Sequence, residues 1–216
     1  MKNTIVWKSV ILVTIVLILD QALKIWVKTN MSLGEDFSYI GSWARIHFVE
    51  NPGMAFGWLL GGKAGKICLS LFRLIAIGGF IWYVRHLVKI KAPQGFIICI
   101  SLVLAGALGN MIDCAFYGLI FDSGTVYQSD LGYYTGYSGV SALSTGGYAP
   151  FLQGCVVDML SFPILQGVYP SWVPGIGGSS YLFFAPVFNI ADSAVTIGVF
   201  SIILFYWKYL KQTGKQ

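Results

Sequence analysis

Four long apolar runs dominate the pattern of hydrophobic and polar positions along the chain. A helix needs about 20 residues to cross the roughly 30 Å hydrocarbon layer of a bilayer. The third run is slightly short for this, but it carries no charge until Asp113. The pattern therefore predicts four transmembrane helices, at about residues 7–27, 67–88, 95–113 and 187–208.

The first run imitates a secretory signal, because Lys2 and Lys8 precede an apolar stretch. The run continues through Asp20 and Lys24 to Trp26 and offers no convincing cleavage site between small residues. We interpret it as a retained first helix.

Composition supports a membrane protein. Hydrophobic residues make up 56% of the chain and charged residues only 11%, whereas a soluble domain carries about 25%. The net charge is +5, but the basic residues form no patch with interleaved aromatic residues, so nucleic acid is not an expected partner.

Basic residues gather at one end of the predicted spans. The two termini and the short turn between the second and third spans contain none of the 9 Asp and Glu residues. They do contain Lys2, Lys8, Arg85, Lys89, Lys91, Lys208, Lys211 and Lys215. The positive-inside rule places both termini and the 85–95 turn in the cytoplasm.

Two long connections then lie outside the cytoplasm. Residues 28–66 contain alternating runs such as Arg45–Val49, which predict a small sheet at the membrane surface. Residues 114–186 are rich in Gly, Tyr, Ser and Pro, which favours irregular structure. The prediction is one domain over residues 1–216: a mainly α, polytopic membrane protein with four transmembrane helices, a small extracytoplasmic β-sheet and a long irregular outer loop.

Four cysteines show no CxxC or zinc-type spacing. Cys68 and Cys99 lie within apolar runs, where we interpret them as small buried hydrophobes. Cys114 and Cys155 flank the long outer connection. Whether they pair stays open, because nothing in the sequence fixes their separation.

Polar residues inside the spans converge at one depth. Asp20 lies roughly 20 Å along the first span, and Asn110 lies at a similar height in the third. Asp192 lies roughly 8 Å below the outer end of the fourth span. Because ionisable residues inside a membrane are costly and usually functional, we expect a polar site in the outer third of the bilayer.

Spacing assigns faces to these residues. Asp20 and Lys24 are i and i+4, so they share a helix face and can pair. Asn189 and Asp192 are i and i+3 and also share a face. Asp158 lies in a short apolar stretch within the outer loop, which predicts a strand or re-entrant piece returning to the membrane surface.

Several of these residues have a structural alternative. Asp20 could simply neutralise Lys24, Asn110 could bond another helix, and Asp113 could be an interfacial residue at a helix end. Asp192 is harder to explain structurally, because no basic residue lies within a helical turn of it.

Two further residues give no site. His47 reads as an ordinary surface or strand histidine, and no second histidine lies close enough to suggest a metal, so no metal site is expected. Arg73, near the start of the second span, could extend outward to the membrane surface.

Five motifs, in family order, resemble those of the lipoprotein signal peptidases (signal peptidase II), over most of the chain apart from the long outer loop. They are Asp20-Gln21-Ala22-Leu23-Lys24 (D-Q-x-x-K), Asn51-Pro52-Gly53-Met54-Ala55-Phe56-Gly57 (N-x-G-x-A-F), Gly106-Ala107-Leu108-Gly109-Asn110-Met111-Ile112-Asp113 (G-x-x-G-N-x-x-D), Val157-Asp158 and Phe188-Asn189-Ile190-Ala191-Asp192.

The resemblance implies an aspartic endopeptidase that removes signal peptides from diacylglyceryl-modified prolipoproteins by cleaving before the lipidated cysteine. It implies Asp158 and Asp192 as the catalytic pair. Substrate binding or support of the pair falls to Asn51, Gly53, Asn110 and Asn189, and structural support to Asp20, Lys24 and Asp113.

No cofactor is expected. The expected partners are the lipid-modified precursor and membrane lipids, with the protein a monomer in the bacterial cytoplasmic (inner) membrane and its active site near the outer face.

Two features depart from the family pattern. Arg commonly follows the last Asp of the G-N-x-x-D motif, and here that position is Cys114. The stretch between Asp113 and Asp158 is also much longer than usual, which suggests an outer lid or a surface elaboration.

A proton-coupled small membrane transporter is the alternative function, with Asp20, Lys24 and Asp192 relaying protons. The polar residues are predicted at an outer level rather than the midplane, and no inverted repeat is visible. A purely structural subunit would leave Asp192 unexplained, and the paired motifs of presenilin-like proteases are missing.

Overall fold

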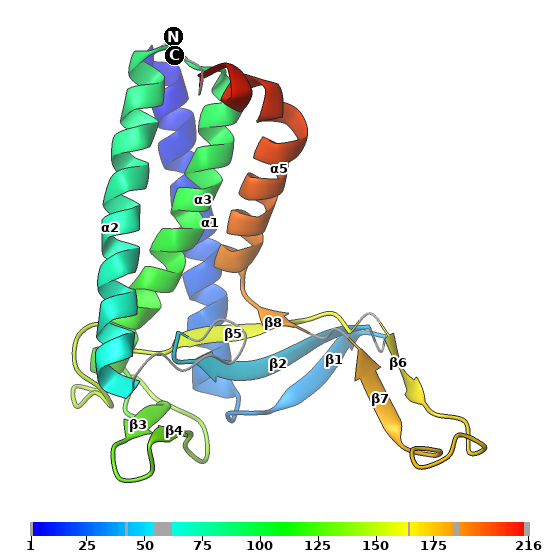
Figure 1. The fold of residues 1–216 in the computed structure, drawn as a ribbon. Helices are drawn as coiled ribbons and strands as arrows, with labels where there is room; N and C mark the ends of the chain where they lie inside the picture. The colour runs from blue at the N-terminus through cyan, green and yellow to red at the C-terminus, as the bar shows by residue number, and fades with distance from the viewer. Residues whose placement is uncertain (1, 42, 54–61, 164, 184–185, 214–216) are drawn as a thin grey trace.

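The computed structural model describes residues 2–41, 43–53, 62–163, 165–183 and 186–213. Long helices stand side by side as a bundle and carry a sheet across one end (Figure 1). The first turn of the first helix and the last turn of the last helix lie together at the opposite end. We call these two ends of the bundle the sheet end and the terminal end.

Within the described residues, four helices are long and apolar enough to cross a membrane, as predicted. They are α1 (Lys2–Asn30), α2 (Gly62–Lys89), α3 (Gln94–Ile112) and α5 (Ile190–Thr213). Helical hydrogen bonding continues into polar flanks, so α1 and α2 extend beyond the apolar runs that predicted them. The last helix begins three residues later than predicted, because Val187–Phe188 pair in the sheet as β8.

The helix α3 also differs at its end. It passes into one π-helical turn, η1 (Asp113–Tyr117), and a last turn, α4 (Gly118–Ile120). Such π turns are frequent at functional sites. The turn begins at Asp113, the last residue of the G-x-x-G-N-x-x-D motif.

Apolar side chains cover the outside of the bundle. Trp7, Ile75 and Phe205 are 65%, 74% and 76% exposed, which suits contact with lipid. The central helix is α3, whose apolar window is 61% buried, against 17%, 11% and 17% for α1, α2 and α5. Small residues allow α3 and α5 to approach: a Cβ at Gly106 would overlap the carbonyl oxygen of Ala191.

The sheet has the order β1-β2-β5-β8, and its neighbouring strands are antiparallel. The first three strands are β1 (Asp36–Ile40), β2 (Ala44–Asn51) and β5 (Val156–Ser161). Burial alternates along β2, which confirms the strand predicted from period-2 patterning. Asp158 lies on β5, as a strand rather than a re-entrant piece.

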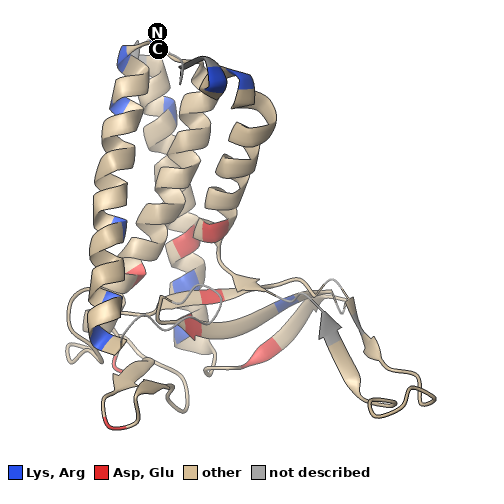
Figure 2. Ribbon diagram, viewed as in Figure 1, with Lys and Arg blue, Asp and Glu red and all other residues tan. Residues whose placement is uncertain are grey.

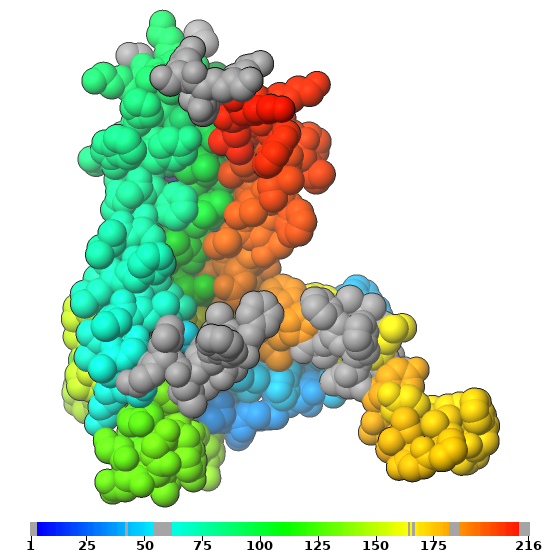
Figure 3. Space-filling view, in the orientation of Figure 1, coloured from blue at the N-terminus to red at the C-terminus, as the bar shows by residue number. Residues whose placement is uncertain are grey.

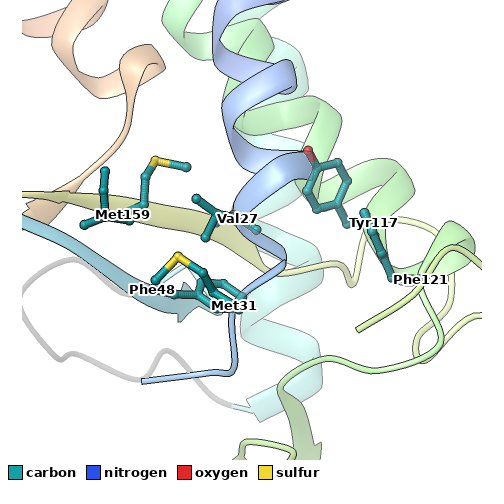
Figure 4. Close-up of a cluster of buried hydrophobic side chains, with 8 residues drawn as sticks. Val27, Met31, Phe48, Tyr117, Phe121 and Met159 are labelled. Atoms are coloured by element: carbon teal, nitrogen blue, oxygen red, sulfur yellow. The ribbon is translucent and has the colours of Figure 1, made fainter. Parts of the chain in front are cut away.

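An apolar cluster joins this sheet to the helices. It sits where the end of α1 meets β2, β5 and η1 (Figure 4). Its labelled members are Val27, Met31, Phe48, Tyr117, Phe121 and Met159. The cluster fixes the strand that carries Asp158 against the first and third helices.

Residues 121–155 form an insertion that packs against the sheet end. It contains the hairpin of β3 (Val126–Gln128) and β4 (Tyr133–Thr135). A second hairpin, β6 (Leu165–Val168) with β7 (Ser180–Phe183), projects from the sheet, clear of the bundle (Figure 3). The stretch predicted to be irregular therefore contains short strands joined by loops.

Lys28 fixes the insertion in place. Its ammonium is fully buried, is paired with Glu50 and donates to the carbonyl oxygen of Ser123 at 2.9 Å. The ring of Phe121 lies 5.1 Å from it. The other oxygen of Glu50 accepts from the backbone N–H of Thr125 at 2.5 Å. The insertion is thus a clamped elaboration of the surface rather than a loose lid.

All four cysteines are free. Cys99 is buried as predicted, whereas Cys68 is exposed on the bundle surface, so that expectation was wrong. Cys114 and Cys155 do not pair. Each accepts a hydrogen bond from a cation instead: Arg73 Nη1 lies 3.0 Å from Cys114 Sγ, and a lysine lies beside Cys155.

Candidate active site

A buried ion triad lies where α1 and α3 approach the sheet. The Nζ atom of Lys24 lies 2.9 Å from Asp20 Oδ2 and 2.8 Å from Asp113 Oδ2. All three side chains are wholly buried. The i, i+4 pairing of Asp20 with Lys24 is confirmed, while Asp113 is a buried member of the triad rather than an interfacial helix end.

The two carboxylates of the triad each hold a piece of backbone. Asp20 Oδ1 accepts from the N–H of Ala191 at 2.8 Å, and Asp113 Oδ2 accepts from the N–H of Val157 at 3.1 Å. Ala191 directly precedes Asp192, and Val157 directly precedes Asp158. One lysine therefore pairs with both of the carboxylates that fix the chain next to the two predicted catalytic acids.

Asn110 connects the triad to Asp192. Its Oδ1 accepts from Lys24 Nζ at 2.9 Å, which orients the amide, because an ammonium group can only donate. Its Nδ2 then donates to Asp192 Oδ1 at 2.7 Å. Asn110 therefore bonds side chains on two other helices, α1 and α5, as its structural alternative predicted, and its role in supporting the catalytic pair stays a prediction.

Asn189 and Asp192 form a capping box at the start of α5. The N–H of Asp192 donates to Asn189 Oδ1 at 2.8 Å, and Asp192 Oδ2 accepts from the N–H of Asn189 at 3.4 Å. This box fixes the Asp192 carboxylate at the positive end of the helix dipole, where negative charge is stabilised. The predicted shared face is confirmed.

Asn189 also joins the two acids. Its Nδ2 donates to Asp158 Oδ1 at 2.6 Å and lies 3.1 Å from Asn110 Oδ1. Asp158 is 5% exposed. Burial, and then the charge of Asp192, raise the pKa of Asp158 to about 7, although the charge of Lys24 opposes this shift. The structure brings Asp158, Asp192, Asn110 and Asn189 into one network, near the sheet end where the acidic residues gather (Figure 2).

The residues of the N-x-G-x-A-F box lie beside this network only in part. Asn51 ends β2, its side chain bonds Asp158 and its Oδ1 accepts from the N–H of Gly53 at 2.9 Å. Gly53 has φ +101°, which favours glycine, and a Cβ there would lie 2.8 Å from the side chain of Leu69. The remainder of the box, residues 54–57, lies outside the described residues.

Three residues of the site had no predicted role. Gln21 Nε2 donates to Asp113 Oδ1 at 2.9 Å, and the hydroxyl of Tyr117 donates to Gln21 Oε1 at 3.1 Å. The sequence did offer a signal for Gln21, because it is a polar residue next to Asp20 within an apolar span. A Cβ at Gly109 would lie 2.8 Å from Asp20 Oδ2, so the second glycine of its motif makes room for the triad.

The fold and site define a polytopic membrane protein in which a buried ion triad positions two hydrogen-bonded acids. Comparison with known proteins identifies the family within this class. The model of the signal peptidase (SPase) II family matches residues 12–208, and the chain belongs to this family.

Relatives of the chain carry the same family name. A lipoprotein signal peptidase of Porphyromonas gingivalis is 46% identical over 198 residues, covering 90% of this chain and 80% of that protein. One from Amoebophilus asiaticus is 34% identical over 202 residues, covering 92% and 77%. A solved structure described as a bacterial membrane enzyme is 26% identical, with a TM-score of 0.55, and covers 97% of this chain and 91% of its own.

Proposed function

We propose that this chain is an aspartic endopeptidase that removes signal peptides from diacylglyceryl-modified prolipoproteins, with Asp158 and Asp192 as its catalytic pair. One observation carries the proposal: the side chain of Asn189 bonds the Asp158 carboxyl and caps the helix turn that presents Asp192. A buried acid and a partly buried acid joined in this way are suited to acid–base chemistry on a peptide bond.

The two acids take different roles because their surroundings differ. Asp158 retains a proton to a much higher pH than an ordinary carboxyl group, since burial and the neighbouring negative charge raise its pKa to about 7. Asp192 carries the negative charge at a helix N-terminus and accepts from Asn110 Nδ2.

The reaction then follows from these protonation states. Asp192 removes a proton from a water molecule as its oxygen bonds to the scissile carbonyl carbon. Asp158 donates a hydrogen bond to the carbonyl oxygen, where charge develops. As the C–N bond breaks, the proton taken from water passes to the leaving amine. General acid–base catalysis of this kind contributes roughly 10²–10⁴-fold to a rate.

The substrate assignment rests on the relatives, which are named lipoprotein signal peptidases. A precursor whose cysteine carries diacylglyceryl has its scissile bond held at the membrane interface by the lipid. The candidate site lies where the helices meet the sheet, at the ends of the four candidate membrane-spanning helices that this proposal assigns to the outer side.

We also propose that the terminal end faces the cytoplasm and the sheet end faces outward. Basic residues of α2 and α5, including Arg85, Lys89 and Lys211, gather at the terminal end (Figure 2). A reporter fused after Gln216 should be active only in the cytoplasm. Activity of that reporter outside the cytoplasm would reverse the orientation and with it the side on which cleavage occurs.

Cleavage of a defined precursor tests the function. Purified protein should cleave a diacylglyceryl-modified precursor before the modified cysteine and leave the unmodified precursor intact. Asp192→Asn should accumulate in membranes yet cleave neither. If the wild-type protein leaves the precursor intact, the peptidase assignment is contradicted. That result is the one expected for a transporter. Normal cleavage by the variant would remove Asp192 from the catalytic pair.

A further inference from the structure

A pocket lies at the sheet end of α2, apart from the proposed catalytic residues. Its volume is about 200 Å³, smaller than the roughly 300–1,000 Å³ typical of sites for drug-sized ligands. The start of α2 forms one wall, and the insertion of residues 121–155 forms the others. It is lined chiefly by Lys63, Lys66, Thr125, Tyr127, Tyr134 and Tyr148, all separate from the proposed catalytic residues.

Lys66 is a buried cation in the wall of this pocket. It is only 6% exposed. Its Nζ donates to Cys155 Sγ at 3.2 Å and lies 5.5 Å from the centre of the Tyr134 ring. Within the described part of the chain it makes no ion pair with a carboxylate. Glu50, an acid close enough to influence Cys155, is already paired with Lys28.

These partners leave the charge of Lys66 poorly compensated. Burial raises the pKa of the Cys155 thiol to about 12, although Lys66 opposes the shift, so the thiol is neutral. A neutral thiol is a weak acceptor, and a cation–π contact contributes about 0.5–2 kcal/mol. Removing an unpaired ammonium from water costs several kcal/mol. A bound anion would supply the missing compensation.

Other groups around the pocket are donors. Lys63 lines it one turn before Lys66. Both lie in the first turns of a 28-residue helix, whose N-terminal N–H groups and positive dipole end attract anions. The hairpin β3–β4 is held against this helix start (Figure 3), where the Tyr134 hydroxyl donates to the carbonyl oxygen of Gly62 at 3.5 Å. No Asp or Glu occurs among the described residues that line the pocket.

We propose that this pocket binds a phosphate group, either that of an anionic phospholipid headgroup or inorganic phosphate. A phosphate presents several acceptor oxygens to two ammonium groups and a helix N-terminus, and it fits a small pocket rich in donors. The apolar run of α2 begins at Ile67, directly after Lys66, so the pocket lies at the depth of lipid headgroups.

Two measurements distinguish the sources of phosphate. The first follows thermal unfolding of the detergent-purified protein as sodium phosphate is added, against sodium chloride at equal ionic strength. The second compares retention of phosphatidylglycerol and phosphatidylcholine by native mass spectrometry. Saturable stabilisation by phosphate, or selective retention of phosphatidylglycerol, supports the site, and the arm that responds identifies the source.

Variants localise the effect. Lys63→Gln and Lys66→Met should each weaken the apparent affinity about tenfold or more, because each removes a charged hydrogen-bond donor. Lys211→Gln removes the same charge at the terminal end and should change nothing. Lys63 is exposed, so its variant decides the question if Lys66→Met fails to fold. Equal responses to phosphate and chloride without lipid selectivity, or equal weakening by Lys211→Gln, would overturn the proposal.

Discussion

Replacing Asp158 with asparagine should make the protein more stable at neutral pH while removing its activity. Asparagine resembles the protonated acid and keeps the oxygen that accepts from Asn189 Nδ2. The folded-state pKa of Asp158 is about 7, above the ordinary value of 3.8, so between about pH 4 and pH 7 the folded state binds more protons than the unfolded state. Stability therefore declines as pH rises through that window.

The magnitude follows from the size of the shift. At 1.36 kcal/mol per pKa unit, a rise from 3.8 to about 7 corresponds to about 4 kcal/mol of lost stability by pH 8. The Asp158→Asn variant has no carboxyl group to ionise at this position, so its stability should not fall in this way as the pH rises. Relative to the wild type it should gain up to about 4 kcal/mol at pH 8, which for a chain of this size is roughly 10 °C in melting temperature, and nothing at pH 4.

Thermal unfolding in detergent at a series of pH values measures this difference. The matched control is Asp130→Asn, which changes an exposed acid in the turn between β3 and β4 and should follow the wild-type curve. A variant at position 158 less stable than wild type at pH 8, or one with the same pH dependence, would refute a buried, protonated Asp158. The variant's gain in stability with loss of cleavage would be a stability–activity trade-off.

Three further substitutions probe the support of the pair. Lys24→Met leaves two buried carboxylates without their cation and should destabilise the protein by about 3–5 kcal/mol in thermal unfolding. The control is Lys8→Met, which removes an exposed lysine from the same helix. An equally small loss for both variants would contradict the triad's role. Asn189→Ser keeps a capping oxygen but loses the amide donor to Asp158, so turnover should fall about tenfold or more, with a loss of stability of about 1–3 kcal/mol from the unpaired buried acceptors. Unchanged turnover would contradict the bridging role. Gly106→Ala should cost about 1–3 kcal/mol by separating α3 from α5, whereas Gly78→Ala, with open space around its Cβ, should be neutral; equal effects would contradict that close approach.

Much of the architecture follows from local pattern. Run length and hydropathy predict the four spans, and period-2 alternation predicts β2. The i, i+4 spacing predicts that Asp20 and Lys24 pair, and the i, i+3 spacing places Asn189 beside Asp192. These predictions succeed because each depends on the geometry of a single helix or strand.

The rest depends on packing between distant segments. Asp113 joins Lys24 across 89 positions of sequence, through a π turn that periodicity does not indicate. Cys114 stands where the family commonly has Arg, but the sequence does not indicate that Arg73, from another helix, lies against the Cys114 sulfur. The burial of Lys28 among aromatic rings likewise depends on the insertion, which folds back onto α1. The motif resemblance directed attention to residues that the structure brings together, but the network of contacts among them comes from the structure.

The central claim is that two acids act as one catalytic unit, and a double-mutant cycle tests it most directly. Single-turnover cleavage of the diacylglyceryl-modified precursor would be measured for Asp158→Asn, Asp192→Asn and the double variant. Residues that act as a unit show strongly non-additive losses. Each single variant should therefore lose roughly 10³-fold or more, with no further loss in the double variant. A single variant within tenfold of wild type, or losses that multiply in the double variant, would contradict the shared role of the two acids.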